Sequence, residues 1–371
     1  MKKIKVLYII TGLGPGGAEF TIQKILSKLD KNVFEVIVIS LRDVRDLANT
    51  MRKHTNKIYI LNFGKYSNFF GEFIKLRRII KQEKPDILHC FMIHSNLVGR
   101  LFAINNNYKV ISSVRTQLRN RFPLNLLDLL SQGLVNVYMV NSSAVRNFVE
   151  GYGLPREKIV LIENGVDFNN YTLEQVGIDD LKNELNLKNL PTITMIANLK
   201  KGKDYPTFIQ SLSLLQKEME FNALIVGRGM HFDDQTIVLK ELTRGLNLEN
   251  IHFLGFRKDI PKILSITDIW VSTTLFEGQS NSLLEAMAMK KKIITTDIPE
   301  NSEVVRHEKE ALLIPIKNPK ELTKAIKRLI QEKEFASNLA DNAYKRAYEK
   351  YNSDIMVKKI EKLYSFLVKI V

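Results

Sequence analysis

This 371-residue chain has one cysteine, and we recognise neither a long apolar run nor a signal peptide in it. The single cysteine, Cys90, excludes an internal disulfide framework and fits a reducing compartment. We interpret it as a small buried apolar residue, with a metal or nucleophile role as the alternative. No apolar run approaches the roughly 18 to 20 residues that cross a bilayer, and the apolar stretch after Met-Lys-Lys is too short for a signal peptide. We expect a cytoplasmic protein, soluble or peripheral.

Acidic residues are also scarce: 40 Asp and Glu stand against 55 Lys and Arg, which gives a net charge of +15. Such a surface attracts nucleic acid, nucleotide phosphates or an anionic membrane. A nucleic-acid-binding module would interleave stacking aromatics with Arg and Lys. No such module is recognisable, so a basic nucleic-acid-binding protein stays a minor alternative, and we expect no nucleic acid partner.

Short β-rich runs alternate with helical patterns along the chain, and a polar, Asn-rich stretch at 163–189 separates two series of them. With 371 residues and 45% apolar residues, two domains can each bury a core. The alternation predicts two doubly wound α/β domains with parallel sheets, which bind ligands beyond the carboxyl ends of their strands. The default site is then the cleft between the domains. Predicted strands are KIKVLYII, FEVIVIS, KIYIL, DILHC, KVISSV, VYMVNS, TITMIANL, NALIVG, IHFLG, IWVSTT, KIITTD and ALLIPI; predicted helices are 18–29, 69–84, 96–104, 205–216, 234–246, 261–266, 282–289 and 319–330.

The glycine-rich segment GLGPGG at 12–17 fits the pattern G-x-G-x-x-G between a predicted strand and a predicted helix. That context is typical of a dinucleotide-binding turn and raises the alternative of a nicotinamide dehydrogenase. Such an enzyme needs an acidic residue about 20 positions beyond the glycines to bind a ribose. Here the second strand ends in IVIS at 37–40, and Asp43 follows only later. The dehydrogenase interpretation therefore loses its main support.

A denser set of polar residues follows the predicted strand that contains Trp270. A loop with Glu277 and Gly278 leads into a predicted helix that carries Glu285. A glycine-bearing loop before a helix N-terminus presents free N–H groups and the positive end of a dipole, which suits a phosphate. A carboxylate inside the helix suits a ribose, because it accepts hydrogen bonds from both hydroxyls. Two alternatives stay open: Ser282 and Glu285 also form a capping box, which needs no ligand, and Glu277 is either solvated or functional.

Glu277, seven intervening residues and Glu285, followed by Ala-Met-Ala, closely resemble the E-x7-E signature of family-4 glycosyltransferases of the bacterial surface-polysaccharide type. These are retaining enzymes with the GT-B fold. The resemblance covers nearly the whole chain in the right order, through Gly16-Gly17-Ala18-Glu19, Val140-Asn141-Ser142, residues 162–167, Ala197-Asn198-Leu199 to Lys203, Val226-Gly227-Arg228-Gly229, and Phe253-Leu254-Gly255-Phe256-Arg257 with Asp259.

The resemblance implies two Rossmann-like domains that face a central cleft. The N-terminal domain, residues 1–168, would bind the acceptor, and the C-terminal domain, residues 169–351, would bind the nucleotide-sugar. A C-terminal helix at about 352–371 would pack back on the first domain. The donor would be a nucleotide-sugar, most readily a UDP-sugar, with no required cofactor or metal; the chain contains no Asp-x-Asp pair.

Within the donor site, Lys203 matches the lysine that neutralises the donor diphosphate. The arginine that usually stands five residues earlier is Asn198 here, which puts the two-cation clamp in doubt. Lys200 and Arg228 are the candidates to supply the missing charge.

The two glutamates also have counterparts in the family. Glu285 matches the ribose-binding glutamate, and Glu277 matches the glutamate that faces the transferred sugar. The other donor-binding positions, several of them acting through the backbone, are Gly16, Gly17, Gly227, Arg257, Gly278, Gln279, Ser280 and Asn281.

Two candidate catalytic residues besides Glu277 come from the N-terminal domain. His94 lies in a segment that resembles the one where a histidine caps a helix facing the cleft. Arg115 stands where many relatives carry a histidine close to the reacting sugar. An arginine cannot act as a base at neutral pH, but it can stabilise diphosphate charge in the transition state. The alternatives are a core or surface histidine and a surface arginine.

The residues at 69–84, FFGEFIKLRRIIKQEK, predict an amphipathic helix with a basic face, and the loop at 115–123 adds further cations. Such a helix either lies on an anionic membrane or packs on the core with a solvated face. We expect an enzyme that visits the inner face of the plasma membrane and glycosylates a saccharide or a polyprenyl-diphosphate-linked acceptor. A sugar-nucleotide 2-epimerase-like enzyme of the same fold is the alternative; it would need a catalytic acid pair, and the E-x7-E pattern argues against it.

Overall fold

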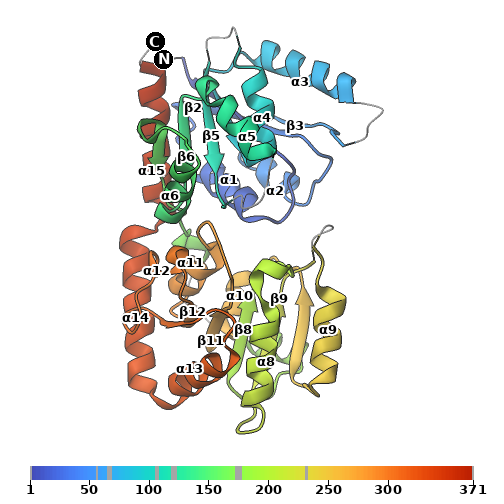
Figure 1. Ribbon diagram of the computed structural model, residues 1–371, viewed down its shortest axis with the longest axis vertical. Coiled ribbons are helices and arrows are strands. Elements are labelled where there is room, and N and C mark those ends of the chain that lie inside the picture. Colours follow the sequence, from blue (N-terminus) through green and yellow to red (C-terminus); the bar gives the residue numbers. More distant parts are fainter. Residues whose placement is uncertain are drawn as a thin grey trace. The chain divides into compact units, whose positions relative to one another are not determined.

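The computed structural model describes residues 2–55, 57–64, 69–104, 108–117, 123–171, 178–229 and 233–369. The chain forms two compact units, one made of residues 1–165 together with 353–371 and the other of residues 166–352. These divisions lie close to positions 168 and 351, where the resemblance placed them. In each unit, helices flank a parallel sheet (Figure 1), so two doubly wound domains are present as predicted.

The sheet of the first unit has, in the described residues, seven parallel strands in the order β3-β2-β1-β4-β5-β6-β7. The strands form because short runs rich in branched residues are buried on both faces. Alternate side chains of β1 enter two different cores: Val6 and Tyr8 face α1 and α15, whereas Leu7 and Ile9 face α3. The strands are β1 Ile4–Ile10, β2 Phe34–Ser40, β3 Ile58–Ile60, β4 Ile87–Phe91, β5 Lys109–Val114, β6 Val137–Val140 and β7 Ile159–Leu161.

Helices of the first unit come from both ends of the chain. They are α1 Gly17–Lys28, α2 Ala48–Arg52, α3 Phe69–Glu83, α4 Ile93–Leu101, α5 Leu124–Leu130, α6 Ser143–Gly151 and the C-terminal α15 Ser353–Lys369. Cys90 of β4 is fully buried, and burial raises the pKa of its thiol to about 12. The prediction of a buried apolar cysteine is confirmed. A Cβ at Gly99 of α4 would lie 2.2 Å from its Sγ, so the glycine lets this helix pack directly on β4.

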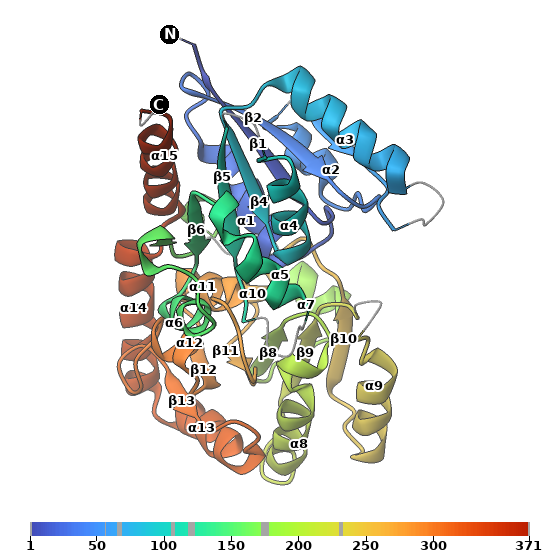
Figure 2. The same cartoon turned by 45° about the horizontal axis from the view of Figure 1, so that its top comes forward.

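The C-terminal helix α15 is attached to the N-terminal sheet by a buried chain of hydrogen bonds. The Tyr364 hydroxyl lies 2.8 Å from that of Tyr8 and 2.6 Å from Nδ1 of His89. The other ring nitrogen of His89 lies 2.7 Å from the Ser113 hydroxyl. Burial keeps the pKa of His89 well below its ordinary value, so the neutral ring donates one bond and accepts the other. Figures 1 and 2 show α15 beside strands that precede it by more than 200 residues.

The second unit repeats this plan, with six strands in the described residues in the order β10-β9-β8-β11-β12-β13. Helices α8 and α13 pack on one face, against Ile193 and Val271. Helices α11 and α14 pack on the other face, against Trp270 and Ile293. The strands are β8 Thr192–Ile196, β9 Asn222–Val226, β10 Ile251–Gly255, β11 Ile269–Ser272, β12 Lys292–Thr296 and β13 Leu312–Ile314; the helices are α7 Ile178–Glu184, α8 Tyr205–Leu215, α9 Thr236–Gly245, α10 Ile260–Ser265, α11 Asn281–Ala288, α12 Pro299–Ser302, α13 Pro319–Gln331 and α14 Lys333–Lys350.

Each sheet has one position where the strand order reverses, so that later strands are added on the other side of the first. It lies between β1 and β4 in the first unit and between β8 and β11 in the second. The loops after these strands separate there, which makes the carboxyl edge at this position the usual ligand site of a doubly wound sheet. Among the described residues, no helix combines the length and apolar character needed to cross a membrane.

Candidate functional site

The carboxyl edge of the second sheet collects the predicted donor-site residues of this unit. Lys203 ends a short 3-10 helix, Lys201–Lys203, that follows β8, and Glu277 lies in the loop that follows β11. Because β8 and β11 are neighbours where the strand order reverses, the two loops meet. The structure thus brings Lys203 and Glu277 together across 74 residues of sequence.

Backbone and threonine hydrogen bonds join these two loops. The Thr274 hydroxyl donates to the Gly202 carbonyl at 3.1 Å, and the Leu275 N–H donates to the same carbonyl at 2.9 Å. The Thr273 hydroxyl donates to the Lys203 carbonyl at 3.1 Å. A Cβ at Gly202 would lie 2.8 Å from the Phe276 ring, so the glycine leaves room for this ring. The positions of Lys203 and Glu277 are therefore set by the backbone.

The Lys203 ammonium forms an ion pair with the Glu277 carboxylate, and each side chain is about 15% exposed (14% and 15%). Burial, reinforced by the nearby positive charge of Lys200, lowers the pKa of Lys203. Contact with the Glu277 carboxylate opposes this shift, because an opposite charge favours the ammonium form. Lys200 lies close to Lys203, because the Lys203 N–H donates to the Lys200 carbonyl at 3.0 Å.

The segments that follow β8 and β9 are in close contact at this edge. The Leu199 N–H donates to the Arg228 carbonyl at 3.0 Å, which places Asn198 beside the turn after β9. Gly227 has a φ of +148°, and a Cβ there would lie 1.9 Å from the Ala197 carbonyl oxygen. Only glycine fits this turn without displacing the backbone.

We expect Gly227→Ala to lower the free energy of unfolding by about 3 kcal/mol or more, because it combines backbone strain with a clash. Thermal unfolding measures the loss. Gly245→Ala is the matched control: Gly245 is the last residue of α9, and an added Cβ meets nothing within 4 Å. The control should be neutral or stabilising by up to about 1 kcal/mol. Equal melting temperatures for the Gly227 variant and wild type would contradict this assignment.

The N-terminus of α11 differs from the capping-box alternative. Ser280 is the N-cap residue, and its hydroxyl accepts the Leu283 N–H at 3.4 Å. Asn281 is the first helical residue, so Glu285 lies in the second turn, too far along to close a box with Ser282. That interpretation is wrong. Gly278, Gln279 and Ser280 are all buried in the approach to the helix.

Glu285 has a partner that the sequence did not reveal. The hydroxyl of Tyr171, which directly follows the 3-10 helix Phe168–Asn170, hydrogen-bonds to the Glu285 carboxylate. Burial and this carboxylate together raise the pKa of Tyr171 well above its ordinary value, so the phenol is the donor. No local pattern links the two residues, since 114 positions separate them.

The two arginines of this edge are engaged by other side chains. Arg257 donates to Asp259 at 2.9 and 2.7 Å and to Glu184 at 2.9 Å. These bonds hold the Arg257 guanidinium against two carboxylates. The Arg228 guanidinium lies over the Phe256 ring, 5.6 Å from its centroid.

In the first unit, the same edge collects the glycine loop, His94 and Arg115. Gly16 is the N-cap of α1, and Gly17 is its first residue. A Cβ at Gly16 would lie 2.3 Å from Oε2 of Glu19, so this glycine accommodates the folded-back carboxyl of Glu19. Arg115 follows β5 and donates to the Thr21 hydroxyl at 3.3 Å and to the Asn164 side chain. It is half-buried, and these bonds hold its guanidinium in place.

His94 lies in the first turn of α4 and is exposed; it does not cap the helix, because Met92 is the N-cap residue. Met92 has a φ of +73°, a strained conformation for a residue with a side chain, at the β4 end of the reversal point. Residues 118–122 of the predicted basic loop lie outside the described residues.

Burial raises the pKa of Glu19 to about 7, and the charge of Arg115 partly opposes the shift. Between its ordinary pKa of about 4.5 and pH 7, the native state then binds more protons than the unfolded state. Glu19 thus lowers stability as pH rises through this range, by at most about 3 kcal/mol at pH 8. We expect Glu19→Gln to match wild type near pH 4 and to be more stable at pH 8, as measured by thermal unfolding.

The control for this pH dependence is Glu334→Gln, which removes an exposed glutamate from the first turn of α14. That variant should keep the pH dependence of wild type. If Glu19→Gln also keeps it, Glu19 ionises normally in the folded protein.

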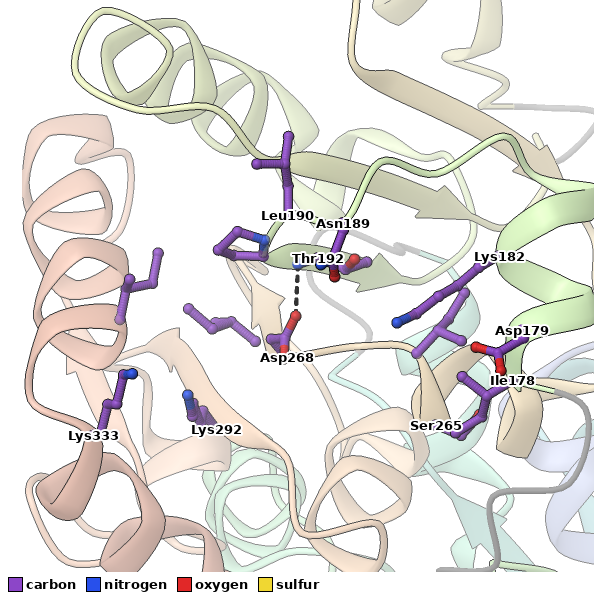
Figure 3. Close-up of a pocket in the computed structure, with 14 residues that line it drawn as sticks. Ile178, Asp179, Lys182, Asn189, Leu190, Thr192, Ser265, Asp268, Lys292 and Lys333 are labelled. Atoms are coloured by element: carbon purple, nitrogen blue, oxygen red, sulfur yellow. Dashed lines mark hydrogen bonds between the residues drawn. The ribbon is translucent and has the colours of Figure 1, made fainter.

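A hollow of about 550 Å³ opens at the opposite, amino edge of the second sheet (Figure 3). It is bordered by the starts of β8, β11 and β12, and the Thr192 N–H donates to Asp268 there at 2.8 Å. Lys292 and Lys333 lie on one side of it and Lys182 on the other. It is remote from Lys203 and Glu277, which follow the carboxyl ends of these strands.

Comparisons with known proteins agree with this arrangement. Residues 15–170 match the family described as Glycosyltransferase Family 4, and residues 190–332 match the family described as Glycosyl transferases group 1. The chain is 27% identical to N,N'-diacetylbacillosaminyl-diphospho-undecaprenol alpha-1,3-N-acetylgalactosaminyltransferase of Campylobacter jejuni, over 93% of this chain and 94% of that protein. It is 26% identical to UDP-Gal:alpha-D-GlcNAc-diphosphoundecaprenol alpha-1,3-galactosyltransferase of Escherichia coli, over 80% and 79% of the two chains.

A similar solved structure is that of Anabaena HepE in complex with UDP-glucose, with a TM-score of 0.86 and 21% identity over 97% of this chain and 99% of that one. This likeness establishes the fold. Together, the two family matches, the full-length relatives and the shared architecture show that the chain is a glycosyltransferase of family 4 with the GT-B fold.

Proposed function

We propose that this glycosyltransferase moves a sugar from a UDP-sugar to a saccharide linked to a polyprenyl diphosphate, with retention of the anomeric configuration. One observation carries the donor part of the proposal. Lys203, Glu277, the α11 N-terminus and Glu285 all lie at the carboxyl edge where β8 and β11 diverge. That edge combines a cation and free N–H groups for a diphosphate with carboxylates for sugar hydroxyls.

In the proposed reaction, the bond between the anomeric carbon and the β-phosphate oxygen breaks, the carbon becomes cation-like, and an acceptor hydroxyl oxygen forms a bond to that carbon while its proton passes to the departing diphosphate. Lys203 and the N–H groups at the start of α11 stabilise the charge that develops on the departing diphosphate. Glu285 holds the ribose, with Tyr171 fixing its carboxylate. Arg115 of the first unit is proposed as a further cation, and His94 as an acceptor contact. The donor is a substrate, and the proposal includes no metal or other cofactor.

The names of two relatives support the choice of substrates. The relative from Escherichia coli is named for UDP-galactose and for a diphosphoundecaprenol-linked acceptor. The relative from Campylobacter jejuni is also named for a diphospho-undecaprenol acceptor.

A panel of UDP-, GDP- and ADP-sugars tests the donor. A UDP-sugar should raise the melting temperature, and transfer to a lipid-diphosphate-linked saccharide should follow with the same sugar. If no nucleotide-sugar of the panel stabilises the protein, the donor-site assignment is wrong. Glu285→Ala separates binding from stability: it should weaken donor binding more than it lowers the melting temperature.

The acceptor part of the proposal includes a peripheral contact with an anionic membrane, at the inner face of the plasma membrane. Helix α3, light blue in Figures 1 and 2, buries Leu76, Ile79 and Ile80 against the sheet. It nevertheless leaves Phe70 82% exposed, together with Phe69 and Ile74. Exposed cations on the same helix are Lys75, Arg77, Arg78 and Lys81. Exposed aromatic groups beside basic side chains suit the surface of an anionic bilayer.

Sedimentation with vesicles of phosphatidylglycerol and phosphatidylcholine tests this contact. Wild type should bind the anionic vesicles, and neutralising Lys75, Arg77 and Arg78 should reduce binding by about tenfold or more, since each basic residue contributes about 1 kcal/mol near such a surface. Neutralising Lys258, Lys262 and Lys333 of the second unit is the control with the same charge change. Failure of wild type to bind would remove the membrane from the proposal.

A further inference from the structure

The carboxylate of Glu277 lies in contact with the cation that the proposed function assigns to the donor diphosphate. Lys203 and Glu277 form an ion pair, and hydrogen bonds from Thr273 and Thr274 fix both loops through the backbone. A diphosphate that approaches Lys203 therefore brings its negative charge close to the Glu277 carboxylate. Phosphate binding at this edge is opposed by Glu277, although it is favoured by Lys203.

The local charge is finely balanced, because Asn198 is neutral and supplies no compensating cation. Three lysines, Lys200, Lys201 and Lys203, lie on the segment that follows β8. Lys201 is exposed, whereas Lys200 is near enough to disfavour charge on Lys203. The Glu277 carboxylate is in contact with Lys203, and both side chains are only 14–15% exposed, so water screens their charges weakly. One additional negative charge on a ligand bound at Lys203 is therefore repelled noticeably by Glu277.

An intact nucleotide-sugar and its nucleoside diphosphate product differ in this respect. The β-phosphate of UDP is unesterified, and a terminal phosphate of this kind loses its second proton near pH 6, so it carries nearly one additional charge at pH 7.5. In a UDP-sugar, the same phosphate is esterified, and the sugar offers hydroxyl groups. A carboxylate accepts hydrogen bonds from such hydroxyls, whereas UDP presents in their place only the charged end of its β-phosphate.

We propose that Glu277 discriminates the intact nucleotide-sugar from the nucleoside diphosphate that the reaction leaves behind. It accepts hydroxyl groups of the donor and repels the additional charge of the product, which favours product release. The inference rests on the proposed function, because it takes Lys203 as the diphosphate site. The contact of Glu277 with the sugar is already expected. The inference adds a second role, which Glu277 performs after the sugar has been transferred.

Isothermal titration calorimetry of wild type and Glu277→Gln with UDP and with the UDP-sugar selected by the panel tests this role. The variant should bind UDP about tenfold more tightly than wild type, because the repelling charge is gone. It should bind the UDP-sugar no more tightly than wild type. In steady-state assays, its inhibition constant for UDP should fall while kcat also falls.

Glu218→Gln is the matched control, since it removes one negative charge from an exposed pair with Lys327 at the surface of the same unit. It should leave both affinities unchanged. Glu277→Asp is the second variant: it keeps the charge but shortens the side chain, so its preference for the donor over UDP should lie between those of wild type and Glu277→Gln.

The outcomes separate the inference from the function beneath it. If wild type binds neither UDP nor any nucleotide-sugar, the proposed donor site fails. If wild type binds both ligands, and Glu277→Gln changes neither affinity or changes both by the same factor, the donor site stands and the discriminating role is overturned. Should Glu277→Gln not fold, an unchanged preference in Glu277→Asp overturns the role as well.

Discussion

Lys203→Met is expected to lower kcat/KM for the nucleotide-sugar by about 100- to 1000-fold, the usual effect of removing one preorganised group that stabilises transition-state charge. The loss should be large here because Asn198 replaces the second cation of the family pattern. Methionine preserves the unbranched shape of the lysine chain, so the packing around Gly202 and Phe276 should survive. Steady-state kinetics and UDP titration together measure the effect.

Lys201→Met is the matched control for this prediction. Lys201 lies two residues earlier in the same 3-10 helix, but its side chain is exposed. It should change kcat/KM by less than about threefold, in keeping with the small effects of most surface substitutions. Lys203→Arg should recover part of the activity by restoring the charge. A Lys203→Met enzyme with nearly normal kcat/KM would mean that the diphosphate binds elsewhere.

The second large effect is expected on stability, at the buried ion pair between Arg100 of α4 and Asp128 of α5. Both side chains are 1% exposed, and Arg100 also donates to the Ser131 hydroxyl at 2.9 Å. Asp128 accepts the Tyr152 hydroxyl at 2.6 Å. Arg100→Met would leave the carboxylate buried without its counter-ion, so it should lower the free energy of unfolding by about 3–5 kcal/mol. Urea denaturation measures the loss.

A double-mutant cycle makes this prediction specific. The double variant Arg100→Met with Asp128→Leu removes both charges and leaves no unpaired charge in the core. Its loss in the free energy of unfolding should therefore be smaller than the sum of the losses of the two single variants. The exposed pair of Lys290 and Asp341 is the control, and Lys290→Met should cost less than about 1 kcal/mol. Additive losses at Arg100 and Asp128 would show that the pair contributes no coupling.

The alternation of strands and helices was sufficient to predict the two doubly wound sheets, because each buried strand is a short, nearly continuous apolar run. Strand β7, Ile159–Leu161, was missed. It is a three-residue edge strand, and two of its residues are only partly buried, so it lacks the long apolar run that marks the central strands. The helix predicted at 96–104 begins at Ile93 instead. Its N-cap residue is Met92, which follows β4 directly and has a positive φ.

The candidate site was predictable to the extent that it follows strand ends and the E-x7-E spacing. The contacts that hold it were not. Tyr171 reaches Glu285, and Arg115 reaches Asn164, across 114 and 49 residues respectively, and no local periodicity encodes such pairs. The helix cap was misplaced by two residues, because Ser280 and Ser282 are both good capping residues and only the backbone geometry distinguishes them.

The return of α15 to the first unit affects the order of events during synthesis. The second unit is continuous in sequence, from 166 to 352, whereas the first needs residues 353–371 to cover Tyr8 and His89. Every strand and helix of the second unit is therefore made before α15 exists. The first unit, although its strands are made earlier, lacks the cover over Tyr8 and His89 until residues 353–371 have been added. Of the two units, the one whose strands are made first is thus the last to have all its parts.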